Sequence, residues 1–246
     1  MTAHGTCSTL PLAVLLLASA AARAADPGPV RTVVAKTVLP NPEGAPLHFK
    51  LARVEVAPGE AASAGDPASM VYVVSPDSLT VVVGEKRIPV GPGEALFLPG
   101  RSGARFEGTG GRPAAFLHLF LGPAHELDRA RDGSGGVVEL YRTPGPLANL
   151  PAGPLAFDLT RVTFPPHMPP NPPHHRSGDA LYVVLSGAGE FTTGGKTLPR
   201  PAGTVHYETS GLVHQWANPG DSPLVLLVAN VTREGAPAIV PESPRP

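Results

Sequence analysis

Residues 172–187, PPHHRSGDALYVVLSG, place two adjacent histidines, His174 and His175, just before a short apolar run. Imidazole nitrogens bind divalent transition metals, and a carboxylate such as that of Asp179 can complete such a site. Arg176 stands among them, where a metal ion would not favour it. Its planar guanidinium instead suits the carboxylate of an anionic substrate, unless it is a solvated loop arginine. The stretch therefore indicates a metal centre, whole or damaged, or a polar loop.

Five of the nine histidines lie within residues 167–214, and this clustering favours a site. His174 and His175 are adjacent, and adjacent strand residues point to opposite faces. Only one of them should bind a metal unless the strand bulges. His206, in the apolar stretch GTVHYE, is either a satisfied core histidine or an added ligand. His214 lies in the stretch HQWAN, and its alternative is a hydrogen-bonding histidine in a turn.

The composition favours a many-stranded β protein. The 28 glycines and 32 prolines separate short apolar runs, which is typical of strands joined by turns. The net charge of −1 comes with no long run of charge, so the clustered basic face of a nucleic-acid-binding protein is not expected. We expect a small-molecule ligand or substrate as the partner.

The N-terminus carries the pattern of a secretory signal peptide. An apolar run from Leu10 to Ala22 is followed by a small-x-small cleavage site that ends at Ala24. The run is too short to span a membrane as a helix. We therefore predict a periplasmic or secreted protein with no membrane segment after cleavage. Because Cys7 lies in this segment and is the only cysteine, the mature chain would have no disulfide.

The sequence contains an internal repeat of one unit. The stretch APLHFKLARVEVAPG (45–59) recurs as GPLAFDLTRVTFPPH (153–167), and VYVVS (71–75) recurs as LYVVL (181–185). The order is kept and the offset stays near 110 residues, which indicates duplication. We expect a signal peptide, a first unit, a linker with one short helix, a second unit and a tail, at residues 1–24, 33–121, 122–146, 147–232 and 233–246.

Two stretches of the second unit resemble the two motifs of the cupin superfamily. TSGLVHQWAN matches the second motif at Gly211, His214 and Asn218, with Thr209 in place of the proline. The pair of units resembles a bicupin. The resemblance implies an all-β fold of two tandem cupin jelly-roll β-barrels, each a double-stranded β-helix.

The first motif is present in outline in HHRSGDALYVVLSG. Counted back from Gly187, His174 falls on its first histidine, Arg176 on its second histidine and Ala180 on its glutamate. In the first unit, the 110-residue offset places no histidine at any ligand position. Ala64, Asp66, Met70 and Ala104 stand there instead. We therefore expect the first unit to be a degenerate cupin domain that acts as a structural partner.

The resemblance implies one divalent transition metal in the second unit: Fe, Mn, Ni, Zn or Cu. We predict His174, His206 and His214 as its ligands, with His175 in place of His174 if the register slips. Whether a carboxylate completes the site stays open, with Asp179 and Glu208 as the candidates. Arg176, Tyr182 and Trp216 are the predicted substrate contacts, and the two aromatic residues serve equally well to fill the core.

By family analogy, the leading hypothesis is an exported metal-dependent oxidoreductase, a dioxygenase of the quercetinase type on a small, phenolic substrate. The alternative is a non-catalytic cupin module that binds or senses a small ligand or sugar. A purely structural bicupin is the third hypothesis, and the histidine cluster argues against it. A homodimer is a possible assembly.

Overall fold

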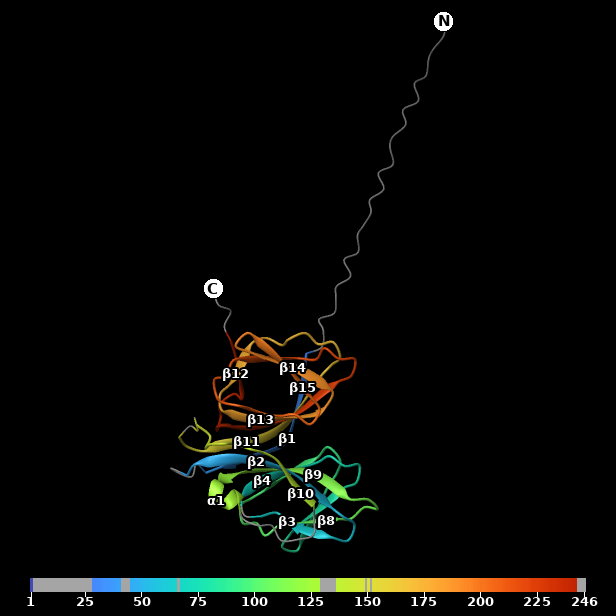
Figure 1. Cartoon of the computed structure of the whole chain (residues 1–246), viewed down its shortest axis with the longest axis vertical. Helices are drawn as coiled ribbons and strands as arrows, with labels where there is room; N and C mark the ends of the chain where they lie inside the picture. The colour runs from blue at the N-terminus through green and yellow to red at the C-terminus, as the bar shows by residue number, and fades with distance from the viewer. Residues whose placement is uncertain are drawn as a thin grey trace.

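The computed structural model describes residues 28–40, 45–65, 67–128, 136–148 and 152–242, together with Met1 and Leu150. These residues form almost only β-strands, which pair antiparallel within four sheets (Figure 1). Each half of the chain closes two sheets into a barrel. The predicted all-β fold of two tandem barrels is therefore confirmed.

The C-terminal barrel consists of a junction sheet, which faces the other barrel, and an outer sheet. Between them lies a core that includes Val162, Phe191 and Leu226. In spatial order, the junction sheet contains β1 (Val30–Leu39), β11 (Leu155–Phe164), β18 (Leu224–Arg233), β13 (Asp179–Ser186) and β16 (Val205–Glu208). The outer sheet contains β15 (Lys196–Pro201), β14 (Ala188–Thr193), β17 (His214–Ala217), β12 (His174–Arg176) and β19 (Ile239–Pro241).

The N-terminal barrel has an equivalent junction sheet and a four-stranded outer sheet around its own apolar core. Its junction sheet contains, in spatial order, β10 (Gly136–Arg142), β2 (Leu47–Val56), β9 (Ala114–Pro123), β4 (Ala68–Val73) and β7 (Ala95–Leu98). Its outer sheet contains β3 (Ala61–Ser63), β8 (Arg105–Gly108), β5 (Leu79–Val83) and β6 (Lys86–Val90). Within the described residues there is one short helix, α1 (Ala124–Leu127).

The two halves exchange their first strands. Strand β1 begins the N-terminal half, yet it pairs with β11 of the C-terminal barrel over nearly its whole length. Strand β10 comes after the N-terminal half and pairs back with β2. The range 122–146, expected to be a linker, therefore contributes a strand to the N-terminal barrel. Each barrel thus contains a strand that the sequence repeat assigns to the other half or to the linker.

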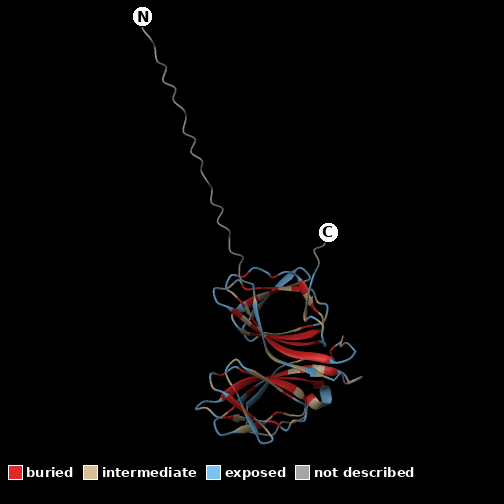
Figure 2. Cartoon of the chain, turned by 180° about the vertical axis from the view of Figure 1, so that it is seen from behind, coloured by how far each residue is buried: buried red, intermediate tan, exposed pale blue. Residues whose placement is uncertain are grey.

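The two junction sheets pack on each other and bury the largest core of the molecule. Strand alternation divides their residues: Leu155, Phe157 and Leu159 of β11 face the junction, while Asp158 and Thr160 face the interior of the C-terminal barrel. Figure 2 shows the buried residues concentrated in these two sheets. The site described below is therefore built on the inner face of a rigid, doubly covered sheet.

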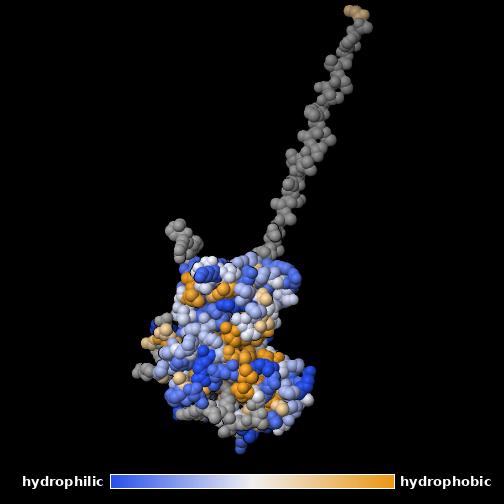
Figure 3. Space-filling model, in the orientation of Figure 1, coloured by the Kyte–Doolittle hydropathy of each residue, from blue (hydrophilic) through white to orange (hydrophobic). Residues whose placement is uncertain are grey.

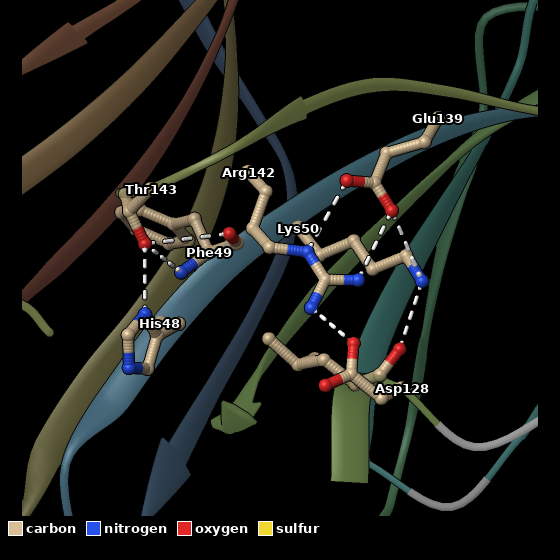
Figure 4. Close-up of polar contacts among 8 residues, drawn as sticks. His48, Phe49, Lys50, Asp128, Glu139, Arg142 and Thr143 are labelled. Atoms are coloured by element: carbon tan, nitrogen blue, oxygen red, sulfur yellow. Dashed lines mark hydrogen bonds and ion pairs between the residues drawn. The ribbon is translucent and has the colours of Figure 1, made fainter. Parts of the chain in front are cut away.

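Strand β10 is also held by an ionic cluster on the surface (Figure 4). Arg142 pairs with Asp128 and, at 3.1 Å, with Glu139. Lys50 of β2 lies 3.3 Å from the same Glu139 carboxylate and donates to the Leu127 carbonyl at 2.8 Å. The backbone N–H of Phe49 donates to Thr143 Oγ1 at 3.2 Å. These contacts fix the end of β10 against β2 and α1.

The two exchanged strands lie at sheet edges and carry exposed apolar side chains. On β1 these include Val33 and Val38, and on β10 they include Val137, Val138 and Leu140. Figure 3 shows apolar side chains gathered around the middle of the molecule on the face in view. A homodimer through such an edge stays a prediction, because no partner chain is present.

Other sequence predictions meet the structure as follows. The predicted signal peptide lies almost wholly in residues 2–27, outside the described part of the chain. The predicted tail, 233–246, contributes β19, which pairs with β12 along His174–Arg176. Among the described residues, no helix has the length and apolar character needed to cross a membrane.

Candidate metal centre

Strands β12 and β17 place His174 and His214 directly opposite each other, with ring centroids 4.3 Å apart. The Nδ1 atom of each ring lies at hydrogen-bond distance from a backbone carbonyl two residues earlier. His174 meets Pro172 at 3.0 Å, and His214 meets Leu212 at 2.9 Å. A carbonyl can only accept, so both Nδ1 atoms are protonated and donate. The Nε2 atom of each neutral ring therefore carries the free lone pair.

Strand β16 brings the third imidazole and a carboxylate. His206 and Glu208 are two residues apart, so both side chains point to the same face of the strand. Glu208 Oε1 lies 3.7 Å from His206 Nε2, and Glu208 Oε2 lies 3.3 Å from His214 Nε2. The Glu208 side chain is fully buried, with 0% of its surface exposed. The carboxylate therefore lies between two imidazoles that come from different sheets.

Burial favours the uncharged forms of the groups in this cluster. It raises the pKa of Glu208 to about 7, against the opposing effect of the Arg176 charge and of contacts with Tyr182 and Trp216. Burial also lowers the pKa of His214 to about 3 and that of His206 to about 4. The histidines are thus neutral at physiological pH, which is the form that binds metals.

Several buried polar atoms of the cluster lack a hydrogen-bond partner. They are both carboxylate oxygens of Glu208 and the Nε2 atoms of His206 and His214. Lone pairs that face one another at such distances repel unless a proton or a cation lies between them. The donor set of neutral imidazoles with one carboxylate is the one that divalent transition metals favour.

The donor atoms lie close to the positions that a metal ion would need, but not at them. Among the described residues, no group of three or more His, Cys, Asp or Glu side chains is arranged to hold a metal ion as it stands. Two ligands at about 2.1 Å from a metal lie roughly 3.0–3.4 Å from each other. The 3.3 Å and 3.7 Å separations around Glu208 are close to that range. The residues therefore fit a metal ion after small side-chain movements.

Two predicted ligands lie away from the cluster. His175 points to the opposite face of β12, where its Nδ1 atom lies 2.6 Å from Glu242 Oε1. Strand alternation explains this, because β12 has no bulge at the motif. Asp179 Oδ1 accepts a hydrogen bond from the Ser210 backbone N–H at 2.8 Å and so holds the loop after β16. Its neighbour Ala180, in place of the motif's glutamate, points toward the cluster.

The predicted substrate contacts form the floor of the cluster. Arg176 is buried, and its Nε donates to the Tyr182 hydroxyl at 2.6 Å. The rings of Tyr182 and Trp216 stack with centroids 5.7 Å apart, and both side chains are almost fully buried. The two aromatic residues thus fill the core and support Glu208. Only Arg176 among the three borders a cavity.

The sequence analysis named Glu208 only as an alternative and did not name Phe191 at all. Phe191 packs against two of the imidazoles, with its ring centroid 4.3 Å from that of His206 and 5.5 Å from that of His214. Glu208 could have been predicted from the sequence, because it lies two residues after His206 and so points to the same face of the strand. Phe191 has no such signal, since an aromatic residue in a strand is ordinary core.

Comparisons with known proteins support the fold. Residues 160–230 match the family model described as "Cupin domain". No curated protein matches the chain in sequence.

Similar solved structures cover both barrels. Oxalate decarboxylase from Bacillus subtilis is 14% identical with a TM-score of 0.57, over 84% of this chain and 73% of that one. AerE from Microcystis aeruginosa is 13% identical with a TM-score of 0.54, over 80% and 97%. A salicylate 1,2-dioxygenase from Pseudaminobacter salicylatoxidans is 14% identical with a TM-score of 0.51, over 80% and 76%. At these identities the likeness is one of fold.

Proposed function

We propose that the cupin domain binds one divalent transition metal through His174, His206, His214 and Glu208, and that the protein is an oxidoreductase on a small organic molecule. The observation that carries the proposal is the buried Glu208 carboxylate, whose two oxygens face the lone pairs of two neutral imidazoles. A buried carboxylate that faces imidazole lone pairs and has no hydrogen bond of good geometry favours a cation site over a packed core.

Within that function, we propose a dioxygenase of the quercetinase type on a phenolic substrate. When bound, the metal supplies the activation of dioxygen or the polarisation of a substrate oxygen. Glu208, whose pKa is about 7, can take up or release a proton near neutral pH. Phe191 and Trp216 exclude water from its surroundings. A cavity of about 600 Å³ lies beside β17 and is lined in part by His214, Gln215 and Thr192.

A non-catalytic binding module is the alternative. It is favoured by the deep burial of the cluster, in which His174 is 5% exposed and His214 is 1% exposed. Export to the periplasm or medium belongs to the proposal in either case, and it depends on residues 1–24.

The test is metal content and affinity. The purified chain, reconstituted in turn with Fe(II), Mn(II), Ni(II), Zn(II) and Cu(II), should hold about one metal per chain by elemental analysis. His214→Ala and Glu208→Gln should each weaken binding by about 100-fold or more. The matched control is His175→Ala, which alters the adjacent imidazole on the opposite face and should bind as the wild type does.

Dioxygen uptake then separates the two functions. The dioxygenase is supported if the loaded chain consumes dioxygen with a panel of phenolic and flavonoid substrates. Metal binding without turnover across that panel supports the binding module. A wild type that stays free of all five metals contradicts the metal-dependent oxidoreductase.

A further inference from the structure

A second polar cavity, of about 390 Å³, lies in the C-terminal barrel beside the metal centre. Its walls come from β1, β11, β18 and β12 and from the segment 235–239 that leads into β19. The lining carries three cationic groups, those of Arg31, Lys36 and Arg176, against one carboxylate, that of Asp158. The cavity is therefore positively charged, by two units.

Arg176 is the buried member of this set. It is 5% exposed, and its Nε donates to Tyr182. Among the described residues, its two terminal NH2 groups have no hydrogen-bond acceptor. The guanidinium makes no direct ion pair with a described carboxylate, although the Glu208 carboxyl lies near enough to feel its charge. A buried guanidinium whose terminal groups are not hydrogen-bonded is suited to an anion that enters the cavity.

Arg31 reaches the same cavity from the exchanged strand β1. It makes no ion pair with any residue that the structure describes. Burial and then the nearby charge of Arg176 lower the pKa of Arg31. Burial is also the main cause of the lowered pKa of His174, to which the charges of both arginines add. Two guanidinium groups thus lie close together and close to the metal motif, with no carboxylate between them.

The single carboxylate of the lining is tied to neutral groups. Asp158 Oδ1 accepts hydrogen bonds from Thr160 Oγ1 at 2.8 Å and from Asn230 Nδ2 at 2.9 Å. The other end of the Asn230 amide, Oδ1, is buried and has no donor. Asn230 lines the cavity, so a small rotation of its amide would present this unused acceptor beside the two arginines, where a ligand hydroxyl group would satisfy it.

We infer that this cavity binds a small hydroxycarboxylic acid, with its carboxylate on Arg31 and Arg176 and its hydroxyl group donating to Asn230 Oδ1. Val33, Val162 and Val228 line the cavity and accommodate an apolar body. The inference deepens the proposed function by naming the substrate class, and as a statement about substrate it rests on that function. Binding itself needs only the cavity.

The experiment is calorimetric titration of the full chain with three matched probes: mandelate, phenylacetate and mandelamide. Mandelate carries both groups, phenylacetate lacks the hydroxyl, and mandelamide lacks the charge. We expect mandelate to bind about 10-fold more tightly than phenylacetate and at least about 10-fold more tightly than mandelamide. The affinity for mandelate should fall as salt is added.

Arg31→Gln is the decisive variant, because Arg31 lies on an exposed edge strand and the substitution should not disturb folding. It should weaken mandelate binding about 10-fold and leave mandelamide binding unchanged. Arg87→Gln, on the exposed strand β6 of the other barrel, is the matched control and should bind mandelate as the wild type does.

Failure of this inference differs from failure of the proposed metal function. Titrations in the presence of EDTA and with the Glu208→Gln variant measure mandelate binding without a bound metal. If mandelate still binds and Arg31→Gln still weakens it, the anion site stands whatever the metal result. The inference is overturned if the wild type does not bind mandelate, if mandelamide binds equally well, or if Arg31→Gln and Arg87→Gln behave alike.

Discussion

The two barrels share one strand order in their junction sheets, but their interiors differ in chemistry. The registers of β7 with β4 and of β16 with β13 make Leu98 of the N-terminal barrel the counterpart of Glu208 in the C-terminal barrel. At the other positions of the cluster, the N-terminal barrel has only apolar residues. Ala64 replaces His174, Leu96 replaces His206, Ala104 replaces His214 and Phe106 replaces Trp216.

The comparison separates what the fold needs from what the site needs. The N-terminal barrel closes around an ordinary apolar core that includes Val71, Leu98 and Phe106. The histidines and Glu208 are therefore not required to close such a barrel. A buried carboxylate reduces stability unless a partner compensates for it, and in the C-terminal barrel that partner is imidazole with a proton or cation.

The strand exchange adds a second role for the N-terminal half. Its first strand, β1, supplies Arg31 to the cavity of the C-terminal barrel. The half without a histidine cluster thus still contributes a charged residue beside the candidate site.

The largest expected effect comes from placing a carboxylate in the apolar barrel. Leu98→Glu should lower the free energy of unfolding by about 4 kcal/mol at pH 8, because the three-histidine cluster has no counterpart at this position. The buried imidazole nearby, that of His118, is already engaged with Ser69 Oγ at 2.9 Å. Urea denaturation measures it. Leu98→Gln separates the cost of the charge from the cost of a polar group. A loss below about 1 kcal/mol would mean that the histidines of the C-terminal barrel are not needed to compensate for Glu208.

A smaller effect is expected from the pH dependence of the metal-free chain. Burial raises the pKa of Glu208 from 4.5 to about 7. An acid with a raised folded-state pKa contributes stability below its unfolded pKa and loses it as the pH rises through the folded value. The wild type in EDTA should therefore lose about 3 kcal/mol relative to Glu208→Gln between about pH 4.5 and pH 8. Chemical denaturation across that range checks this.

The histidines act with the opposite sign and serve as the internal control. The lowered pKa values of His206 and His214 give a contribution that is complete above pH 6.5. That contribution is lost as the pH falls through about 4 and about 3. Parallel pH profiles for wild type and Glu208→Gln would show that Glu208 does not titrate as a buried carboxylate.

The smallest effect concerns the two exchanged strands. Arg142→Ala removes the ion pairs of β10 with Asp128 and Glu139, which are partly exposed, and should cost about 0.5–1 kcal/mol. Arg31→Ala on β1 removes no ion pair with a described residue and should cost less. Thermal unfolding at low and high salt measures both, since only the Arg142 effect should shrink with salt. Equal costs for both variants would contradict this difference.

Much of the fold follows from the sequence because it depends on local periodicity and on the repeat. The matching stretches 45–59 and 153–167 became the equivalent strands β2 and β11. The 110-residue offset predicted Met70 as the counterpart of Ala180. This was wrong by one residue, because the counterpart is Ser69. Met70 belongs to the core at the junction, and Ser69 lies opposite Leu98 as Ala180 lies opposite Glu208.

The candidate site was predictable where motif position, for His174 and His214, or strand alternation applies. Alternation separates His174 from His175, and it groups Glu208 with His206. It says nothing about Phe191, which lies in the separate strand β14, or about Arg31, which comes from the distant strand β1. Both meet the cluster or its cavity only after the barrel has closed.

The sequence by itself determined the all-β class, the duplication and the half of the chain that holds the histidines, because these depend on composition, spacing and order along the chain. Only the tertiary structure decided that β1 and β10 change places and that Glu208 lies between two imidazoles. It also decided that Arg31 lies near Arg176. Those facts depend on which strands become neighbours, and pairing over long sequence separations is set by the burial of whole sheets and not by local sequence.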